Sequence, residues 1–197
     1  MSLAIKHTHK DLETINTQIA SAIIDEEINK ANQLFESIFS QGMTPNTYSY
    51  RCMIRGFTKI NQASKAMALY KDMINRKVNI DQKTYHCLIT TCASVKNYKQ
   101  AKSFYKQMQS AGFQPNTVSY NCMLNVCAKT RKFSEASLLF NDMPIKKVKR
   151  EPITYDTMIH VCRMTDHQQE ALRIQKLMEE DGFQPNDSNQ LYLKSII

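Results

Sequence analysis

The sequence has no tryptophan, only four glycines and only five prolines among its 197 residues. So few glycines and prolines exclude flexible linkers and low-complexity segments. No apolar run approaches the length of about 18 residues that a membrane-spanning helix needs. The alternating patterns typical of β-strands are missing as well. Because 42% of the residues are hydrophobic, a core can still form, and we expect an all-α protein.

The chain contains an internal repeat. Three residue types, tyrosine, methionine and alanine, each recur at intervals of 35 residues and in the same phase. A period of roughly 20 to 50 residues is typical of solenoids, in which one supersecondary unit is stacked repeatedly. Such arrays place equivalent positions along a concave face, so function is expected there and not in one cleft. The three series are expected to form the core between helices. They are Tyr50, Tyr85, Tyr120 and Tyr155; Met73, Met108, Met143 and Met178; and Ala31, Ala66, Ala101, Ala136 and Ala171.

Each repeat has the pattern of two helices joined by short turns. In residues 82–116, one apolar stripe recurs at spacings of three and four residues, and a second follows after Asn97. Gly112 stands where the second helix would end in a left-handed conformation. Asn116 is a suitable N-cap for the next helix. The first stripe comprises Tyr85, Leu88, Ile89 and Cys92, and the second comprises Tyr98, Ala101, Phe104, Tyr105 and Met108.

The recurrence of this two-helix pattern predicts a single right-handed α-solenoid of helix-turn-helix repeats over residues 12–197. In one repeat, Lys147 replaces the glycine of the turn and Arg150 replaces the proline. Apolar residues in the last half-repeat would allow self-association through the C-terminal helix; they are Leu191, Leu193, Ile196 and Ile197. The predicted segments are a short N-terminal segment 1–11, a degenerate repeat 12–46, full repeats 47–81, 82–116, 117–151 and 152–186, and a capping half-repeat 187–197.

The six cysteines share two positions of the repeat, so their spacing follows from the period and needs no metal site. We expect buried, reduced thiols and an intracellular reducing compartment, the cytoplasm. The segment from Met1 to Ala20 lacks the apolar stretch of a secretory signal. It contains Asp11 and Glu13 but no arginine, which argues against a transit peptide.

The formal net charge of +8 and the pI of about 9.2 favour attraction to phosphate backbones, although charge alone is weak evidence. His86, His160 and His167 lie on different repeats or turns, without a nucleophile or carboxylate in a catalytic arrangement. We therefore expect neither an enzyme nor a cofactor.

One family matches this pattern. The motif is Ser/Thr-Tyr-x-x-Met/Leu-Ile/Leu, then Ala, Phe/Tyr and Met, then Gly-x-x-Pro-Asn, and the stretch TVSYNCMLNVCAKTRKFSEASLLFNDM carries most of it. It resembles the pentatricopeptide repeat (PPR) family over residues 12–197. Tetratricopeptide repeats are the nearest competitor, but their tryptophan and Leu-Gly signals are missing and their period is 34 residues.

The resemblance implies binding of single-stranded RNA, with one base read per repeat on the concave face. In the family, the readers are the residue directly after the tyrosine (the first reader) and the last residue of the repeat (the second reader). An apolar residue two places before the tyrosine helps to sandwich the base. The reader pairs are Asn16 with Asn46, Arg51 with Asp81, His86 with Asn116, Asn121 with Glu151, and Asp156 with Asn186. The sandwich residues are Tyr48, Val118 and Ile153, with Lys83 and Glu13 in the other two repeats.

Asparagine as first reader favours pyrimidines in this family. The resemblance therefore implies cytosine for Asn16 with Asn46 and a pyrimidine for Asn121. Arg51 could pair with Asp81 instead of with a base. Phosphate contacts are implied for Arg55, Lys59 and Lys129 on the first helices. Lys146, Lys147, Lys149 and Arg150 form a basic run, which fits either a solvated loop or a further phosphate contact.

We expect a footprint of about four or five nucleotides from one base per repeat, and a role in RNA processing, stability or translation. The alternative is a protein-interaction adaptor, because helical solenoids also bind peptides in their groove and the apolar C-terminal helix could dock on a partner. A third possibility is an assembly subunit of a larger ribonucleoprotein.

Overall fold

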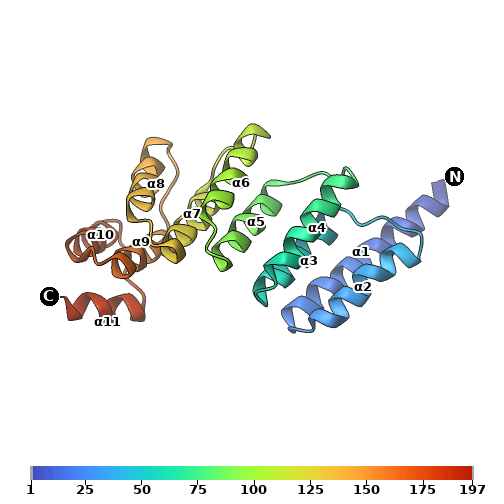
Figure 1. Cartoon of the computed structure of the whole chain (residues 1–197), viewed down its shortest axis with the longest axis horizontal. Helices are drawn as coiled ribbons and strands as arrows, with labels where there is room; N and C mark the ends of the chain where they lie inside the picture. The colour runs from blue at the N-terminus through green and yellow to red at the C-terminus, as the bar shows by residue number, and fades with distance from the viewer. Residues whose placement is uncertain (1, 197) are drawn as a thin grey trace. The chain divides into compact units, whose positions relative to one another are not determined.

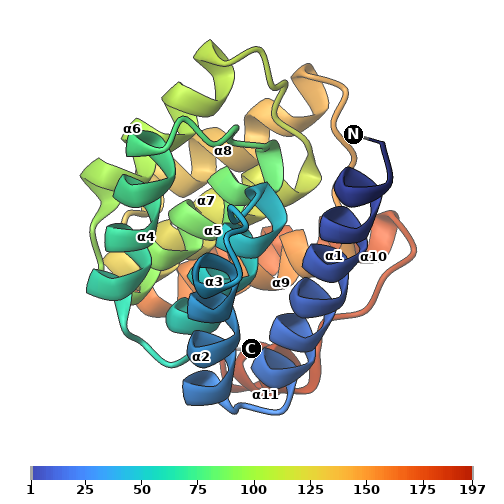
Figure 2. The same cartoon turned by 90° about the vertical axis from the view of Figure 1, so that its right-hand side faces the viewer.

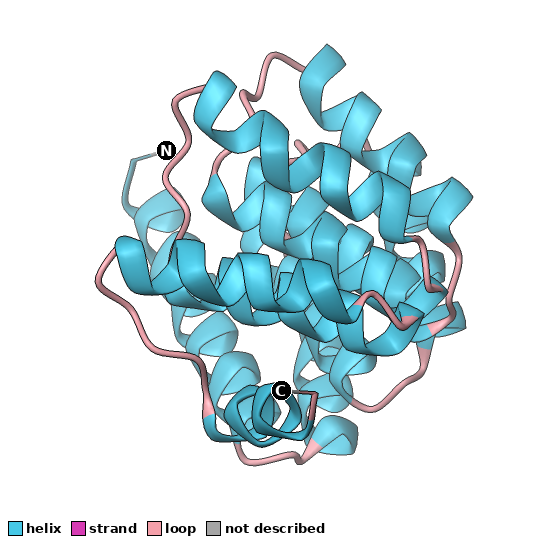
Figure 3. Cartoon of the chain, turned by 90° about the vertical axis from the view of Figure 1, so that its left-hand side faces the viewer, coloured by secondary structure: helices cyan, strands magenta, loops and turns pink. Residues whose placement is uncertain are grey.

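The computed structural model describes residues 2–196, with side chains from residue 11 onward. Within this described range the chain forms helices and no strand (Figures 1 and 3). The predicted all-α fold of stacked helical repeats is confirmed. The helices are α1 (Ser2–Ile24), α2 (Ile28–Ser40), α3 (Thr47–Lys59), α4 (Ala63–Asn75), α5 (Gln82–Ser94), α6 (Tyr98–Ser110), α7 (Thr117–Thr130), α8 (Phe133–Ile145), α9 (Pro152–Thr165), α10 (Gln168–Glu180) and α11 (Asp187–Ser195).

The helices group into two compact parts, one up to Thr91 and one from Cys92. In the first part α1 packs against α2 and α3, and α3 packs against α4 (Figure 2). In the second part α7 packs against α8 and α9, while α9 also contacts α10 and α11. The pairs α1/α2, α3/α4, α7/α8 and α9/α10 are therefore hairpins. Within each part a first helix also packs on the first helix of the next repeat, α1 on α3 and α7 on α9, as a stacked array requires.

The three series predicted as core are buried. Every alanine and methionine of the series is fully enclosed, and the tyrosine rings are at most 6% exposed. The phenols have polar partners that the sequence did not suggest. Tyr50 Oη donates to Asp72 Oδ2 over 2.5 Å, and Tyr120 Oη donates to Asp142 Oδ2 over the same distance. Tyrosine therefore ties the first helix of a hairpin to the second through both packing and a hydrogen bond.

Two places in every repeat have a left-handed backbone. One follows the first helix, and the other follows the second helix, where Gly112 was predicted to end it. At the second place Lys77 and Lys147 adopt positive φ values of 55° and 58°, a conformation that costs a side-chain-bearing residue roughly 1 kcal/mol or more relative to glycine. The residues at the first place are Glu26, Asn61, Lys96, Arg131 and Asp166, and those at the second are Gly42, Lys77, Gly112, Lys147 and Gly182.

The cysteines are free thiols. Four of them are buried, whereas Cys87 and Cys122 are half-buried. The last helix, α11, buries Leu193 at 2% exposure and leaves Leu191 71% exposed. Ile197, predicted to add to this apolar end, lies outside the described residues. None of the helices in the described range is long and apolar enough to span a membrane.

Candidate nucleic-acid interface

The second readers are N-caps of the following first helix. The Oδ1 atoms of Asn46, Asn116 and Asn186 each accept a backbone N–H three residues later, over 3.0 Å. Asp81 accepts the N–H of Thr84 in the same way, over 2.8 Å. Capping satisfies a helix donor that would otherwise have no partner, and it fixes the direction of the capping side chain. These four second readers therefore stand at the N-terminal ends of first helices with their side-chain orientation set.

A further series, which the sequence analysis missed, holds these caps in place. The residue three places after each cap is polar and at most 2% exposed. Ser49 Oγ accepts from the Asn46 N–H over 3.1 Å, and Ser119 Oγ accepts from the Asn116 N–H over 3.2 Å. This reciprocal arrangement is a capping box, and its spacing could have been recognised in the sequence. The series is Ser49, Thr84, Ser119, Thr154 and Asn189.

First and second readers meet in three of the predicted pairs, although 30 residues separate them. Asn16 Nδ2 donates to Asn46 Oδ1 over 3.4 Å. Arg51 forms an ion pair with Asp81, the arrangement that the sequence suggested as an alternative to base contact. The backbone N–H of Asn186 donates to Asp156 Oδ1 over 3.0 Å. His86 and Asn116 belong to different parts of the chain.

Asn16 is held inside the protein. It is 3% exposed, and its Oδ1 accepts from Ser49 Oγ over 2.6 Å. Asp156 is bound in a comparable way, since its Oδ1 also accepts from Asn189 Nδ2 over 2.8 Å. Both contacts come from the residue three places after the cap of the next repeat, Ser49 and Asn189. Intramolecular hydrogen bonds therefore occupy these two first readers.

Arg51 also covers the sandwich residue of its own repeat. Its guanidinium carbon lies 5.1 Å from the centre of the Tyr48 ring, within the range of a cation–π contact. His86 is 9% exposed, and burial lowers the pKa of its imidazole, an effect that the charge of Asp81 opposes. A neutral, buried imidazole follows at neutral pH.

Asn121 differs from the other first readers. It is half-buried on α7, and its Oδ1 is shielded from solvent but has no hydrogen-bond partner among the described residues. A buried acceptor without a donor costs free energy, roughly 1–3 kcal/mol. Native proteins rarely keep such a group without a reason. The pattern suggested Asn121 as a reader but could not show that its acceptor is empty.

The predicted sandwich residues lie on the first turns of α3, α7 and α9. Tyr48, Val118 and Ile153 are 41%, 51% and 55% exposed, and the corresponding residues Lys83 and Glu13 are exposed as well. Large apolar side chains are usually covered in a folded protein. Their exposure at one repeat position, beside the readers, gives an apolar surface that can accept a flat ring.

Cations lie further along the first helices. Arg55, Lys59 and Lys129 are exposed. Lys59 forms an ion pair with Glu26, with 2.9 Å between Nζ and Oε1, whereas Lys129 has no ion-pair partner in the described part of the chain. Arg163 was missed by the sequence analysis. It lies in the last turn of α9, donates to Ser188 Oγ over 3.1 Å and contacts His160 Nδ1 at 2.8 Å.

The four basic residues before α9 differ in exposure. Lys146, Lys147 and Lys149 are exposed, and Lys147 carries the left-handed turn. Arg150 faces inward. Its Nη2 donates to the Phe140 carbonyl over 2.9 Å, and its guanidinium carbon lies 3.9 Å from the centre of the Phe140 ring. Arg150 therefore anchors the loop to α8.

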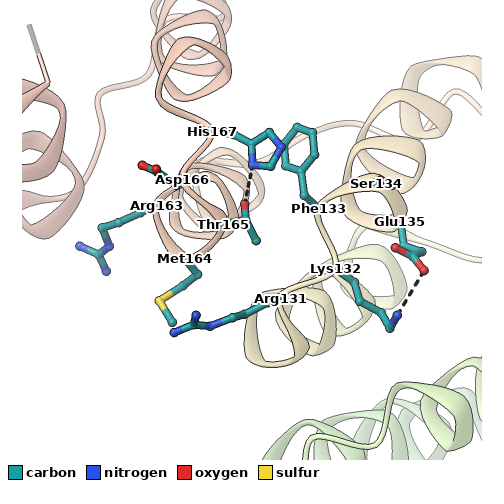
Figure 4. A pocket seen from close by; sticks show the side chains of 10 residues that line it. All are labelled: Arg131, Lys132, Phe133, Ser134, Glu135, Arg163, Met164, Thr165, Asp166 and His167. Atoms are coloured by element: carbon teal, nitrogen blue, oxygen red, sulfur yellow. Dashed lines mark hydrogen bonds and ion pairs between the residues drawn. The ribbon is translucent and has the colours of Figure 1, made fainter.

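The turns after α7 and after α9 border a separate open pocket of about 750 Å³ (Figure 4). Phe133 and His167 stack on its wall with ring centres 3.6 Å apart, and Arg131 and Arg163 contribute cations to its lining. These turns lie at the opposite end of α7 from its N-cap. At about 1.5 Å per residue, the pocket is roughly 15 Å along α7 from the first reader Asn121 and roughly 22 Å from the cap Asn116, so it does not belong to the row of readers.

Comparison with known proteins places this geometry in a family. A family model described as the pentacotripeptide-repeat region of PRORP matches residues 40–196. The chain belongs to the pentatricopeptide repeat family. A search of curated protein sequences finds no significant match.

Solved PPR structures share the fold. The structure of the maize protein PPR10 in complex with an 18-nt psaJ RNA element has a TM-score of 0.84 at 18% identity. That alignment covers 94% of this chain and 27% of PPR10, so the chain spans about a quarter of that relative. The PPR domain of Arabidopsis thaliana protein-only RNase P 1, in complex with tRNA, has a TM-score of 0.75 at 16% identity and covers 93% of this chain and 97% of that domain. At such identities the likeness shows the fold alone.

Proposed function

We propose that this PPR array binds single-stranded RNA along the N-terminal halves of its first helices, with one base per repeat. The main support for this proposal is that first and second readers contact each other. Residues 30 positions apart come together at one end of the first helices, beside an exposed apolar side chain. A base needs both elements, a surface for its ring and polar groups for its edge.

The row of sandwich residues supplies the ring surface. A base that enters between Val118 and Ile153 would cover two apolar side chains that are each more than half exposed. Stacking or apolar contact of this kind is tolerant of sequence, since every base has a flat face. The amide side chains of the caps add hydrogen-bonding groups, because a carboxamide offers a donor and an acceptor together.

The positive charge of the chain also favours RNA as the ligand. Exposed Arg55, Lys59 and Lys129 would face the phosphates, and the net charge of +8 would attract RNA from a distance. Each phosphate neutralised by such a cation releases counterions, so binding should weaken steeply with salt.

The relatives support RNA as the ligand class. PPR10 was solved with an RNA element, and the PPR domain of protein-only RNase P 1 was solved with tRNA. We extend this to a non-catalytic role of the present chain in RNA processing, stability or translation, in an intracellular reducing compartment such as the cytoplasm. Free thiols at all six cysteines agree with such a compartment.

A salt titration tests the proposal. The purified chain is mixed with a labelled pool of random single-stranded RNA, and the dissociation constant is measured from low to physiological salt. We expect binding at low salt and a linear loss of log affinity with log salt, about 0.7 for each phosphate contacted. Duplex RNA of equal length is the control and should bind less well. If no single-stranded RNA binds at low salt, the proposal is wrong.

A protein-interaction adaptor is the second candidate, favoured by the exposed Leu191 on α11. Leu191→Asp should abolish a protein contact or self-association there and leave RNA affinity unchanged. Sedimentation of wild type and variant separates the two functions.

A further inference from the structure

The whole net positive charge of the chain comes from one stretch of the sequence. Residues 82–134 contain eight lysines and arginines and no carboxylate, whereas the rest of the chain contains 18 charged side chains of each sign. From Cys92 onward this stretch belongs to the second compact part. Because no acidic side chain of the same stretch neutralises them, its cations can act together on an anionic partner.

Helix α6 carries a row of lysines along one face. Lys99, Lys102 and Lys106 follow each other at spacings of three and four residues, so they share a face of the helix. All three are exposed, and none has an ion-pair partner in the described part of the chain. The helix itself contains no acidic residue. At about 1.5 Å per residue the row is roughly 10 Å long, which is more than one phosphate group can cover.

The row begins at an open pocket of about 700 Å³ beside the turn before α6. The lysines that line this pocket are Lys96, Lys99, Lys102 and Lys132. The first N–H groups of a helix have no acceptor within it. Asn97 Oδ1 accepts the N–H of Gln100 over 3.1 Å, which leaves the N–H groups of Tyr98 and Lys99 for a ligand. Ammonium groups and the positive end of the helix dipole together favour a phosphate at this place.

The same surface offers little to a nucleobase. The ammonium groups of Lys132 and Lys102 lie 5.1 Å and 5.9 Å from the centre of the Tyr98 ring, so they compete with a base for that ring. Apart from Tyr98, Val95 is the one apolar residue of the pocket lining. Single-stranded RNA is held largely by stacking on aromatic platforms. Duplex RNA is recognised mainly through its shape and its phosphates, and a surface of lysines suits it better.

We propose that this surface is a second RNA site, which binds the phosphate backbone of a duplex stem. The lysine surface consists of Lys96, Lys99, Lys102, Lys106 and Lys132. Lys132 follows the C-terminal end of α7 and is roughly 16 Å along the helix from Asn121, at about 1.5 Å per residue. A stem on the lysine surface therefore leaves the reader end of α7 for a single strand. The preferred ligand is an RNA stem with a single-stranded tail, and only the tail contact rests on the proposed function.

One carboxylate reduces the charge of the lysine surface. Glu135 Oε1 lies 3.6 Å from Lys132 Nζ, and both side chains are partly exposed. Such a pair is weak, but it lowers the charge that Lys132 offers to a phosphate. Glu135→Gln should therefore strengthen binding of a stem, a gain that a misfolded variant would not produce.

The test compares three labelled RNAs at low salt: a hairpin with a blunt stem, a single-stranded oligonucleotide, and the same hairpin carrying that oligonucleotide as a tail. We expect the tailed hairpin to bind about tenfold or more tightly than the oligonucleotide, because two linked contacts reinforce each other. Lys99→Ala/Lys102→Ala should abolish this gain in affinity and leave the oligonucleotide bound. The matched control, Lys176→Ala/Lys194→Ala, removes the same charge from α10 and α11 and should keep the gain. Alanine favours helices, so both double variants should fold.

Several results would overturn the inference while leaving single-strand binding intact. They are a tailed hairpin that binds no more tightly than the oligonucleotide, a gain that survives Lys99→Ala/Lys102→Ala, and an equal loss of the gain in the control variant. Equal displacement of the blunt hairpin by polyglutamate of the same charge would show a general polyanion surface instead of an RNA site. Failure of the oligonucleotide to bind would overturn the proposed function, and the blunt hairpin would then test the lysine surface by itself.

Discussion

The ammonium group of Lys59 lies 2.9 Å from the carboxylate of Glu26, at the left-handed turn after α1. Lys129, at the same position of its own repeat, has no such carboxylate partner within the described residues. Two lysines that are equivalent in sequence therefore differ in the charge they can offer to a phosphate. An exposed ion pair is weak, but it reduces the local field of the cation.

This difference predicts unequal effects of alanine substitution. Lys129→Ala should lower RNA affinity for all sequences and reduce the slope of log affinity against log salt by about 0.7, the contribution of one phosphate on a single strand. Lys59→Ala should have a smaller effect because Glu26 already neutralises part of its charge. Glu26→Gln is the matched control and should increase affinity. Equal losses for the two lysines in salt titrations would contradict the account.

A second prediction concerns the left-handed residue Lys147. Glycine adopts its φ of 58° without steric cost, so Lys147→Gly should stabilise the fold by about 1 kcal/mol. Lys149→Gly, in the same loop but without positive φ, should be neutral or destabilising. Urea denaturation measures both. RNA titration of the same variants shows separately whether the charge of Lys147 contributes to binding.

A third prediction concerns a residue that positions a reader. Ser119 Oγ is buried, accepts the N–H of Asn116 and lies 3.0 Å from Asn116 Oδ1. Ser119→Ala should cost about 1 kcal/mol, as loss of a capping interaction does, and should weaken RNA binding by freeing the cap side chain. Ser119→Thr, the residue type found at positions 84 and 154, should restore both. If affinity falls equally in Ser119→Ala and Ser119→Thr, the hydroxyl does not position the reader.

A fourth prediction is loss of stability at alkaline pH. Burial raises the pKa of the Cys127 and Cys162 thiols to about 12, from a usual value of 9.0. The unfolded chain loses these protons at lower pH than the folded chain, so stability is complete below pH 9 and declines as the pH rises toward 12. The limiting slope is about 1.4 kcal/mol per pH unit for each thiol. Cys127→Ala should show a shallower decline of unfolding temperature between pH 8 and pH 11, and an unchanged slope would refute this origin.

The sequence was sufficient to predict those features that depend on one repeat. Tyr120 and Met143 are buried because their positions recur in phase with the helical period, and Asn116 caps α7 because short polar residues favour that place. Lys147 was recognised in the glycine position, and its positive φ follows from that place.

What the sequence could not show depends on contacts between repeats. The bond from Ser49 to Asn16 spans 33 residues and needs the stacking of two first helices. Arg150 was expected in a basic loop, yet the Phe140 ring and carbonyl hold it. Lys59 and Lys129 occupy the same position of the repeat, but it is Lys59 that forms an ion pair with Glu26. Neighbours in the stack decide which polar groups remain free, and the repeat pattern alone does not contain that information.

Photo-crosslinking tests the central claim most directly. Single-stranded RNA that contains 4-thiouridine is bound at low salt, irradiated and digested, and the crosslinked peptides are identified by mass spectrometry. The account predicts crosslinks on the first turns of the first helices, at or beside Tyr48, Val118 and Ile153. Crosslinks confined to the second helices, α4, α8 and α10, would show that RNA does not lie along the first-helix face and would contradict the account.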